Sequence, residues 1–382
     1  MKDRREARTW AEIDLDALAH NYYTLRALLP PECRFLAPVK ANGYGHGAVP
    51  VAGKLERLGA DMLSVACVDE GAELRRAGIR TPILCMGVTP AQLTGELLDL
   101  DITQTVEDLE SGEALSRQAQ SLGRKLRVHL KVDTGMGRLG VYWGDGDHTA
   151  AVRELLQLCR LPGLEVEGMF THFAVADSDE AYTRRQLDRF LEARAALEEQ
   201  GISLKICHCA ASSAVLHYPC THMDMVRPGI ALYGYYPDPE GDRDSCPPLK
   251  PVMRLYSRIS AVRSMPAGAR ISYGGTAVLK RDSRLAVLPI GYGDGLPRVL
   301  SNRMQVLIGD KLCPVVGRVC MDMCMADITD LPQVRAGDVA QIYGDGLTDR
   351  AAAQADTISY ELLCRVATRV PRIYWENGVR LD

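Results

Sequence analysis

The sequence predicts an α/β fold, in which a (β/α)8 barrel of the TIM type is followed by a C-terminal, mostly antiparallel β domain. The chain has 382 residues, and at roughly 150 residues per domain this length allows two domains. Short apolar, β-branched runs alternate with helical stretches as far as Tyr233. Beyond that residue, alternating runs are separated by Gly and Asp turns. We therefore expect the barrel over residues 1–240 and the β domain over residues 241–382.

The first part of the chain repeats strand and helix without a break, which indicates a parallel sheet. The strand candidates are Arg34–Val39, Met62–Val68, Pro82–Met86, Ile102–Val106, Leu126–Val132, Val166–His172, Leu204–Cys209 and Met223–Arg227. Segments with leucines and alanines at helical spacing lie between them: Val49–Leu58, Asp69–Ala77, Val106–Leu122, Ala150–Leu158 and Ala181–Gln200. Eight such strands match the count of a (β/α)8 barrel, and a doubly wound open sheet is the alternative.

The second part begins with a proline-rich stretch, Tyr236–Pro251, in which neither a helix nor a strand can persist. Alternating apolar and polar residues then predict antiparallel strands. These runs are Leu255–Val262, Arg284–Ile290, Met304–Ile308, Cys313–Val319, Cys324–Ile328 and Val339–Tyr343. One helical stretch, Thr357–Ala367, interrupts them.

The composition excludes several classes of protein. A hydrophobic fraction of 47% and a charged fraction of 25% are those of a globular protein. A net charge of −4 argues against a broad basic surface for nucleic acid. No apolar run approaches the ~18 residues of a membrane span, and Met1–Trp10 lacks the apolar core of a secretory signal, so we expect a cytoplasmic protein. Cys207-His208-Cys209 is the nearest approach to a metal cluster, but buried thiols are the simpler interpretation, and we expect no metal.

Polar and cationic residues follow several of the predicted barrel strands, where chemistry gathers in this fold. These residues are Lys40, Arg138, His172, Ser212 and Arg227. Each alone could be an ordinary loop residue. Together, around an apolar barrel, they favour an anionic ligand.

Lys40 ends the apolar run Phe35–Val39 and precedes a glycine-rich stretch. Partial desolvation and neighbouring cations would lower the pKa of a lysine at this position. A neutral amine is a competent nucleophile toward an aldehyde.

Several segments resemble the alanine racemases, which are pyridoxal-phosphate enzymes with a barrel and a C-terminal β domain. The resemblance covers nearly the whole chain in one order. It is carried by Val39–Gly47 (VKANGYGHG), Lys131–Gly140 (KVDTGMGRLG), Thr171–Phe173 (THF), Val226–Ile230 (VRPGI), Ser272–Thr276 (SYGGT), Gly291–Gly295 (GYGDG) and Gly317–Asp322 (GRVCMD).

The resemblance implies that Lys40 holds pyridoxal 5'-phosphate through an imine and that the cofactor accepts the electrons released when the Cα proton leaves. It also implies that Lys40 and Tyr273 are two bases on opposite faces of the substrate, with Tyr273 supplied by the partner subunit. A phenol has an ordinary pKa near 10, which must fall if Tyr273 is to act as a base. His172 could lower it by hydrogen bonding.

Other roles are implied in the same way. Arg227 faces the pyridine nitrogen and keeps its own proton, which makes the ring a weaker electron sink and disfavours transamination and decarboxylation. The phosphate cradle comprises Tyr44, Ser212, Gly229, Ile230 and Tyr360, with His172 also near the cofactor. Arg138 and the Met321 amide contact the substrate carboxylate, and Cys320 and Asp322 belong to the catalytic set. Lys131 matches a lysine that is carbamylated in some members, and Ala211 stands where many members have Asn.

The expected activity is the interconversion of L-alanine and D-alanine by a homodimer with shared active sites, supplying D-alanine for bacterial peptidoglycan. An alternative is a racemase for serine or a broader range of amino acids. Tyr360, which matches the alanine-type residue, bears against it. A further alternative is a pyridoxal-phosphate carrier without catalysis, but such proteins usually lack a second domain and any equivalent of Tyr273.

Overall fold

The computed structural model describes residues 7–238 and 246–381, which form two compact units. The barrel unit comprises Ala19–Gly43 and Ala48–Leu249. The sheet unit comprises the chain up to Leu18, the short segment Tyr44–Gly47, and the chain from Lys250 onward. Within the described residues no helix is long and apolar enough to cross a membrane.

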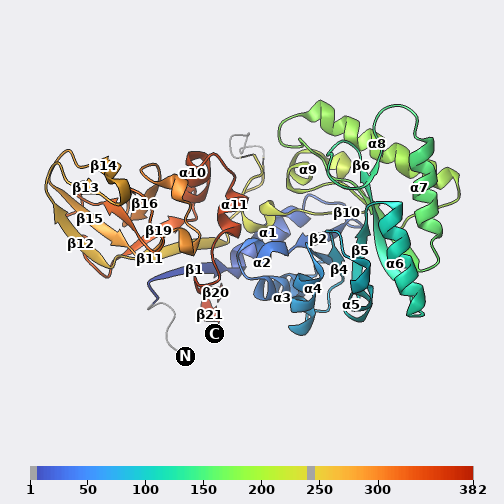
Figure 1. Cartoon of the computed structure of the whole chain (residues 1–382), viewed down its shortest axis with the longest axis horizontal. Coiled ribbons are helices and arrows are strands. Elements are labelled where there is room, and N and C mark those ends of the chain that lie inside the picture. Colours follow the sequence, from blue (N-terminus) through green and yellow to red (C-terminus); the bar gives the residue numbers. More distant parts are fainter. Residues whose placement is uncertain (1–6, 239–245, 382) are drawn as a thin grey trace. The chain divides into compact units, whose positions relative to one another are not determined.

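The barrel unit is built on parallel strands in the order β10-β2-β3-β4-β5-β6-β8-β9 (Figure 1). Their bounds are β2 (Arg34–Pro38), β3 (Met62–Val65), β4 (Ile83–Cys85), β5 (Ile102–Val106), β6 (Leu126–Asp133), β8 (Leu164–Phe170), β9 (Ile206–His208) and β10 (Met225–Val226), and β7 (Val141–Tyr142) adds to β6. An isolated parallel bridge between Ala211 and Arg227 joins the two ends of the sheet, so the barrel is nearly closed. The predicted eight-stranded barrel is confirmed.

Helices connect these strands and flank the barrel (Figure 1). They are α3 (Ala48–Leu58), α4 (Val68–Arg76), α5 (Thr94–Asp99), α6 (Leu109–Ser121), α7 (Thr149–Arg160), α8 (Glu180–Glu199) and α9 (Ser212–His217). Asp108 and Asp179 cap α6 and α8, each accepting a backbone N–H of the first turn at 2.8 and 2.9 Å. Inside the barrel, apolar side chains from five strands pack together: Leu36, Met62, Leu84, Ile206 and Met225.

The sheet unit contains a seven-stranded sheet in the order β17-β16-β19-β11-β1-β20-β21. Its bounds are β1 (Thr9–Asp14), β11 (Met253–Arg258), β16 (Gln305–Ile308), β17 (Lys311–Pro314), β19 (Val339–Tyr343), β20 (Arg372–Glu376) and β21 (Val379–Leu381). A three-stranded sheet contains β12 (Ala261–Met265), β15 (Ser283–Leu288) and β18 (Cys324–Asp327), and a two-stranded sheet contains β13 (Arg270–Ile271) and β14 (Ala277–Val278). Helices α10 (Leu347–Gln354) and α11 (Ser359–Cys364) complete the unit. Apart from the parallel pair β1–β20, the pairings are antiparallel, as predicted.

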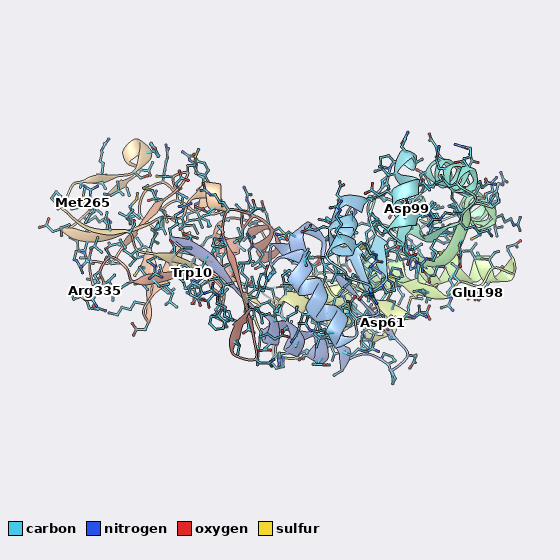
Figure 2. All side chains as sticks on the ribbon, turned by 90° about the horizontal axis from the view of Figure 1, so that it is seen from below. Trp10, Asp61, Asp99, Glu198, Met265 and Arg335 are labelled. Atoms are coloured by element: carbon cyan, nitrogen blue, oxygen red, sulfur yellow. The ribbon has the colours of Figure 1, made fainter. Side chains whose placement is uncertain are left out.

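The N-terminal strand lies outside the barrel, contrary to the expectation that the barrel begins at residue 1. Strand β1, which carries Trp10 (Figure 2), pairs with β11 and β20 in the sheet unit. The Trp10 ring stacks on Tyr256 with centroids 5.5 Å apart. Asp14 accepts the N–H of Ala17 at 2.8 Å and so starts α1 (Leu15–Arg26), which leads into the barrel unit. The predicted boundary between residues 240 and 241 lies outside the described residues.

The segment Tyr44–Gly47 interrupts the barrel unit because its backbone packs within the sheet unit. Arg372 donates to the Gly45 carbonyl at 2.9 Å, and the Tyr374 hydroxyl donates to His46 O at 3.2 Å. Gly45 and Gly47 both have positive φ, and a Cβ on Gly45 would lie 2.0 Å from the carbonyl oxygen of Leu363. The glycines of this motif therefore permit a close backbone approach.

Candidate active site

The carboxyl ends of the barrel strands carry the polar residues that the sequence predicted there. Lys40 follows β2, Arg138 follows β6, His172 follows β8, Ser212 follows β9 and Arg227 follows β10. Parallel strands of a barrel end at one rim, so the fold gathers these five residues at the same mouth.

Lys40 begins a short left-handed turn, α2 (Lys40–Tyr44). Ala41 and Asn42 have φ values of 51° and 55°, which L-residues adopt only at a cost of roughly 1–2 kcal/mol each. The turn is held by Gly43 N–H donating to Val39 O at 2.8 Å, and by Glu70, which accepts the N–H of Ala41 at 2.7 Å. Such strain is typical of functional sites, and here it fixes where the half-buried Lys40 leaves the strand.

Arg227 is buried, and its guanidinium donates to several groups of the barrel. Nη2 donates to the carbonyls of Thr171 at 2.8 Å and Cys209 at 3.1 Å, and lies 3.5 Å from Nδ1 of His172. Nη1 lies 2.7 Å from Nδ1 of His208. Burial lowers the Arg227 pKa to about 10, so the group still carries its charge at neutral pH.

The surroundings of Lys131 and His172, which include the charge of Arg227, favour the neutral forms of both side chains. Burial and then the charges of Arg227 and Arg138 lower the Lys131 pKa well below its usual value. Burial and the charges of Arg227, Lys131, Arg138 and Lys40 lower the His172 pKa in the same way. The charges of Arg227 and Arg138 act on both groups, and such a gathering of cations suits an anionic ligand.

Asp133 organises the loop that leads to Arg138. Its Oδ1 accepts the backbone N–H groups of Gly135, Met136 and Gly137 at 2.9, 2.8 and 3.1 Å. Three donors on one oxygen fix the loop, and Arg138 itself remains exposed.

Ser212 and Ile230 begin two short helical segments that face each other. Ser212 Oγ accepts the N–H of Ala231 at 3.2 Å, next to the start of the 3₁₀ segment Ile230–Tyr233. The first amides of a helix have no partner within it and remain able to bind an anion. Ala211 precedes α9 without a side-chain cap and forms the bridge to Arg227.

The other predicted residues belong to the sheet unit, so the structure groups them separately from the barrel mouth. Tyr44 and Tyr360 lie with ring centroids 6.3 Å apart, and burial raises the Tyr44 pKa. Tyr273 starts a 3₁₀ turn and is 69% exposed. The loop with Cys320 packs beside it, since Ser272 Oγ lies 3.4 Å from Cys320 Sγ.

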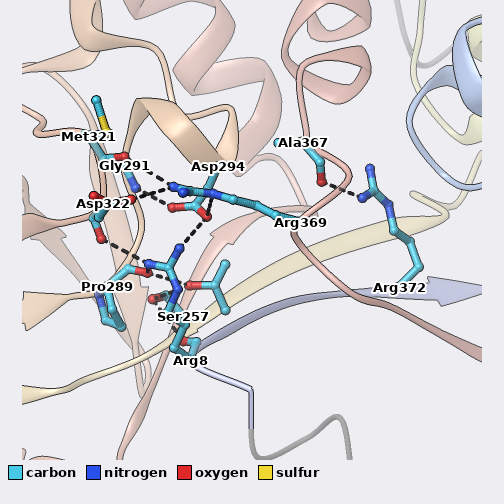
Figure 3. A network of polar contacts seen from close by, with 11 residues as sticks. Arg8, Ser257, Pro289, Gly291, Asp294, Met321, Asp322, Ala367, Arg369 and Arg372 are labelled. Atoms are coloured by element: carbon cyan, nitrogen blue, oxygen red, sulfur yellow. Dashed lines mark hydrogen bonds and ion pairs between the residues drawn. The ribbon is translucent and has the colours of Figure 1, made fainter.

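Met321 and Asp322 are held by a network centred on Asp294 (Figure 3). The Asp294 carboxylate accepts from Arg8 and Arg369, both at 2.8 Å, and from the N–H of Gly291 at 3.0 Å. Arg369 also donates to Asp322 at 2.8 Å. The network joins the turn after β15 to the loop before β18.

Three residues of the barrel interior were not predicted as site residues: Glu167, His129 and His208. His208 lies between the two buried thiols of Cys207 and Cys209 and contacts Arg227. The sequence signal was a histidine alternating with buried residues on a barrel strand, which indicates an inward-facing polar side chain but not its partner.

Comparison with known proteins decides the family. The model of the alanine racemase N-terminal domain matches residues 13–237, and that of the alanine racemase C-terminal domain matches residues 252–374. The chain belongs to the alanine racemase family. Within it, the chain is 45% identical to the alanine racemase of Desulforamulus reducens over 96% of this chain and 98% of the relative, and 47% identical to that of Desulfovibrio desulfuricans with the same coverage.

Solved alanine racemase structures have the same fold. The Clostridium difficile 630 enzyme superposes with a TM-score of 0.92 at 38% identity, covering 98% of each chain. The Bacillus anthracis enzyme with bound L-Ala-P gives 0.90 at 34% identity, covering 98% of this chain and 97% of that one. The family match therefore extends over both units.

Proposed function

We propose that this protein is an alanine racemase, an isomerase that interconverts L-alanine and D-alanine with pyridoxal 5'-phosphate. The observation that carries the proposal is the cationic barrel mouth, with Lys40 at its rim, in a chain that matches both alanine racemase domains. Alanine as substrate is taken from the relatives' names.

The residues at the mouth fit this cofactor by their chemistry. Arg227 is a buried guanidinium that follows a barrel strand, and a group of this kind can donate to an aromatic nitrogen. Ser212 and the amides of Gly229 and Ile230 suit a phosphate dianion. We propose that Tyr44 and Tyr360 add hydroxyl donors and that His172 lines the same site.

The bound cofactor would supply an electron sink for the substrate Cα. Lys40 would hold the cofactor and move a proton on one face of Cα. Tyr273 of the partner subunit would move a proton on the other face. Two bases are the simplest arrangement, because racemisation removes a proton from one side and returns one to the opposite side.

The remaining residues would orient the substrate and steer the reaction. Arg138 and the Met321 amide would bind the carboxylate, because a guanidinium and a backbone N–H both suit carboxylate oxygens. Arg227 would keep its proton and so limit the pull of the cofactor ring, which favours racemisation over transamination. Cys320 and Asp322 would shape the loop that presents Met321.

The assembly and setting follow from the same proposal. We infer a homodimer, because the proposed mechanism takes Tyr273 from a second chain. We also infer that the protein acts in the cytoplasm and that its D-alanine supplies peptidoglycan.

The test combines turnover with chemical mapping. The protein loaded with pyridoxal phosphate should convert L-alanine to D-alanine, measured by chiral chromatography, and should act more slowly on L-serine. Lys40→Ala should abolish conversion, whereas Lys205→Ala, at an exposed lysine, should leave it unchanged. Borohydride reduction and peptide mass mapping should place the cofactor on Lys40. Its recovery on Lys54 or Lys131, or preferred turnover of serine, would contradict the proposal.

A further inference from the structure

Four side chains contact one another in series inside the barrel. Glu167 Oε2 lies 3.6 Å from His129 Nε2. His129 Nδ1 lies 2.8 Å from His208 Nε2, and His208 Nδ1 lies 2.7 Å from Arg227 Nη1. Both imidazoles are fully buried, and Arg227 is 3% exposed. This series of four side chains, from here on the buried series, thus links a carboxylate to the guanidinium at the mouth.

Arg227, at one end of the buried series, determines which ring nitrogen of each histidine carries the proton. A guanidinium only donates, so His208 must accept on Nδ1 and, when neutral, carry its proton on Nε2. That proton points to His129 Nδ1, which must accept, and His129 then carries its proton on Nε2 toward Glu167. Burial lowers the pKa of both histidines, which favours the neutral rings that this order requires. The Glu167 carboxylate, 3.6 Å from that Nε2, faces the N–H with a negative charge at a distance longer than an ordinary hydrogen bond.

The backbone is shaped to bring Glu167 into the chain. The pairing of β6 and β8 runs Val128 with Val166 and then His129 with Gly168, so Glu167 is an extra residue on β8. A bulge of this kind changes the direction of a side chain, is rare between parallel strands and is common beside active sites. Without it, Glu167 would take the place in the ladder that Gly168 holds opposite His129.

Gly168 gives the His129 ring its space. A Cβ on Gly168 would lie 2.9 Å from His129 Cε1 and 2.4 Å from the Ile206 carbonyl oxygen, closer than real Cβ atoms approach. The bulge places Glu167, Gly168 leaves space for the His129 ring, and the proton order points from His129 to Glu167. All three features therefore concern the contact between Glu167 and His129. Core packing alone would require neither a carboxylate nor a bulge here.

We propose that Glu167 and His129 are positioning residues that hold Arg227, through His208, in one orientation and one hydrogen-bonded state at the barrel mouth. The proposal rests on the proposed function, in which Arg227 meets the pyridine nitrogen. Arg34 and Arg127 also act electrostatically on Glu167 and keep its carboxylate ionised, in the same direction as the His129 contact. Through the buried series, the Glu167 carboxylate can partly offset the buried charge of Arg227 without contacting the proposed cofactor site.

Glu167→Gln is the sharpest variant because it changes shape little. A glutamine amide can present to His129 Nε2 either an oxygen, as the carboxylate does at 3.6 Å, or an NH2 donor. In the donating state both histidines must reverse their protons, and His208 Nδ1–H then opposes the Arg227 donor. The variant therefore admits an arrangement that wild type excludes. Glu165→Gln is the matched control, because Glu165 lies on the same strand and is exposed.

The first readout uses protein without cofactor and does not depend on racemisation. In long-range ¹H–¹⁵N spectra of histidine-labelled wild type, His208 and His129 should each have a protonated Nε2 and a bare Nδ1, with signals assigned from His129→Gln and His208→Gln. Glu167→Gln should shift both signals, and Glu165→Gln neither. A protonated Nδ1 on His208 in wild type would overturn the proposal, even if the variants fail to fold.

The second readout is the loaded enzyme. Glu167→Gln should lower kcat for alanine about tenfold, as outer-shell changes do at metal sites, with little change in KM. It should also increase the slow conversion of the cofactor to its amine form, whereas Glu165→Gln should match wild type. An unchanged kcat in Glu167→Gln would contradict the proposal. Absence of racemisation in wild type would contradict only the proposed function, because the spectra would still show which ring nitrogens of His129 and His208 are protonated.

Discussion

Lys131 shows how the surroundings of one residue change its chemistry. Its Nζ lies 4.4 Å from the centroid of the Phe170 ring, and the side chain is buried. Burial and two arginines lower its pKa, with Asp133 as an opposing influence. A lysine in this setting favours the neutral amine, which is the form that reacts with carbon dioxide to give a carbamate.

We predict that Lys131 is carbamylated at pH 8 and loses the group on acidification. The lowered pKa keeps the amine reactive at neutral pH, and the resulting anion is stabilised by Arg138 and Arg227. Protein equilibrated with ¹³C-bicarbonate should show a bound carbonyl signal in its ¹³C spectrum, and this signal should disappear at pH 5. Lys131→Gln should lack it. A signal that persists in Lys131→Gln, or none in wild type, would contradict the prediction.

At this scale the sequence indicates the residues that end strands but not the contacts inside the barrel. Lys40, His172 and Arg227 could be placed at the mouth because each follows an apolar run. The partner of His208 could not be predicted, since alternation along a strand indicates the face a side chain occupies but not what lies opposite. The direction of the Glu167 side chain was harder still to predict, because a bulge breaks the alternation on which such predictions depend.

Among the elements, the turn Tyr292–Asp294 and the loop that carries Met321 are built as one piece. Gly293 N–H donates to Met321 O at 2.8 Å, and Tyr292 N–H donates to Cys320 O at 3.0 Å. Asp294, which is 1% exposed, anchors the turn through Arg8 and Arg369 (Figure 3). The position of Met321 therefore depends on a carboxylate distant in sequence.

We predict that Asp294→Asn destabilises the fold by ~1–3 kcal/mol, because the neutral amide no longer pairs with two arginine charges and turns an NH2 group toward one of three donors. The KM for alanine should also rise, since the loop with the Met321 amide loses its anchor. Urea unfolding and steady-state kinetics measure the two effects. Asp330→Asn is the control, because the Arg281–Asp330 pair has the same kind of contact at 2.7 Å but is exposed. Its loss should lower the free energy of unfolding much less, because water and salt screen an exposed ion pair. Equal effects of the two substitutions would show that the Asp294 network has no special role.

The elements themselves were predicted unevenly. All eight barrel strands were placed, and β5 and β19 matched residue for residue. Strand β1 was missed because it precedes the repeating pattern, and its partners β11 and β20 are distant in the chain. Helix α10 was missed as well, since its alanine-rich sequence lies among strand candidates.

At the scale of the whole molecule, neither unit is a single stretch of chain. The sheet unit takes its interior strand β1 from the N-terminus and the segment Tyr44–Gly47 from the loop after Lys40. Chain length and the change of pattern after Tyr233 indicated two domains but could not reveal this exchange, because it depends on pairing between residues several hundred positions apart. Under the proposed function, Tyr273 of the partner subunit would join the barrel residues of this chain.

We predict that two inactive variants restore activity when their subunits are mixed. If each site takes Lys40 from one chain and Tyr273 from its partner, a dimer of Lys40→Ala with Tyr273→Ala has one intact site and one doubly altered site. Random pairing of equal amounts places half of the dimers in this form, so activity should recover to about a quarter of wild type. Racemisation of L-alanine, measured after subunit exchange has been verified by mass spectrometry of the dimers, provides the test.

The alternative is that Tyr273 serves the site of its own chain. A mixed dimer then pairs one site lacking Lys40 with one lacking Tyr273, and neither works, so mixing leaves activity at the level of the separate variants. A mixture of Lys40→Ala with Arg227→Ala is the matched control. Both residues belong to one barrel mouth, so no mixed dimer regains a complete site, and recovery there would show that the assay reports something other than shared sites. Recovery in the first mixture without recovery in the second would assign Tyr273 to the partner's site and make the dimer the smallest active form of the molecule.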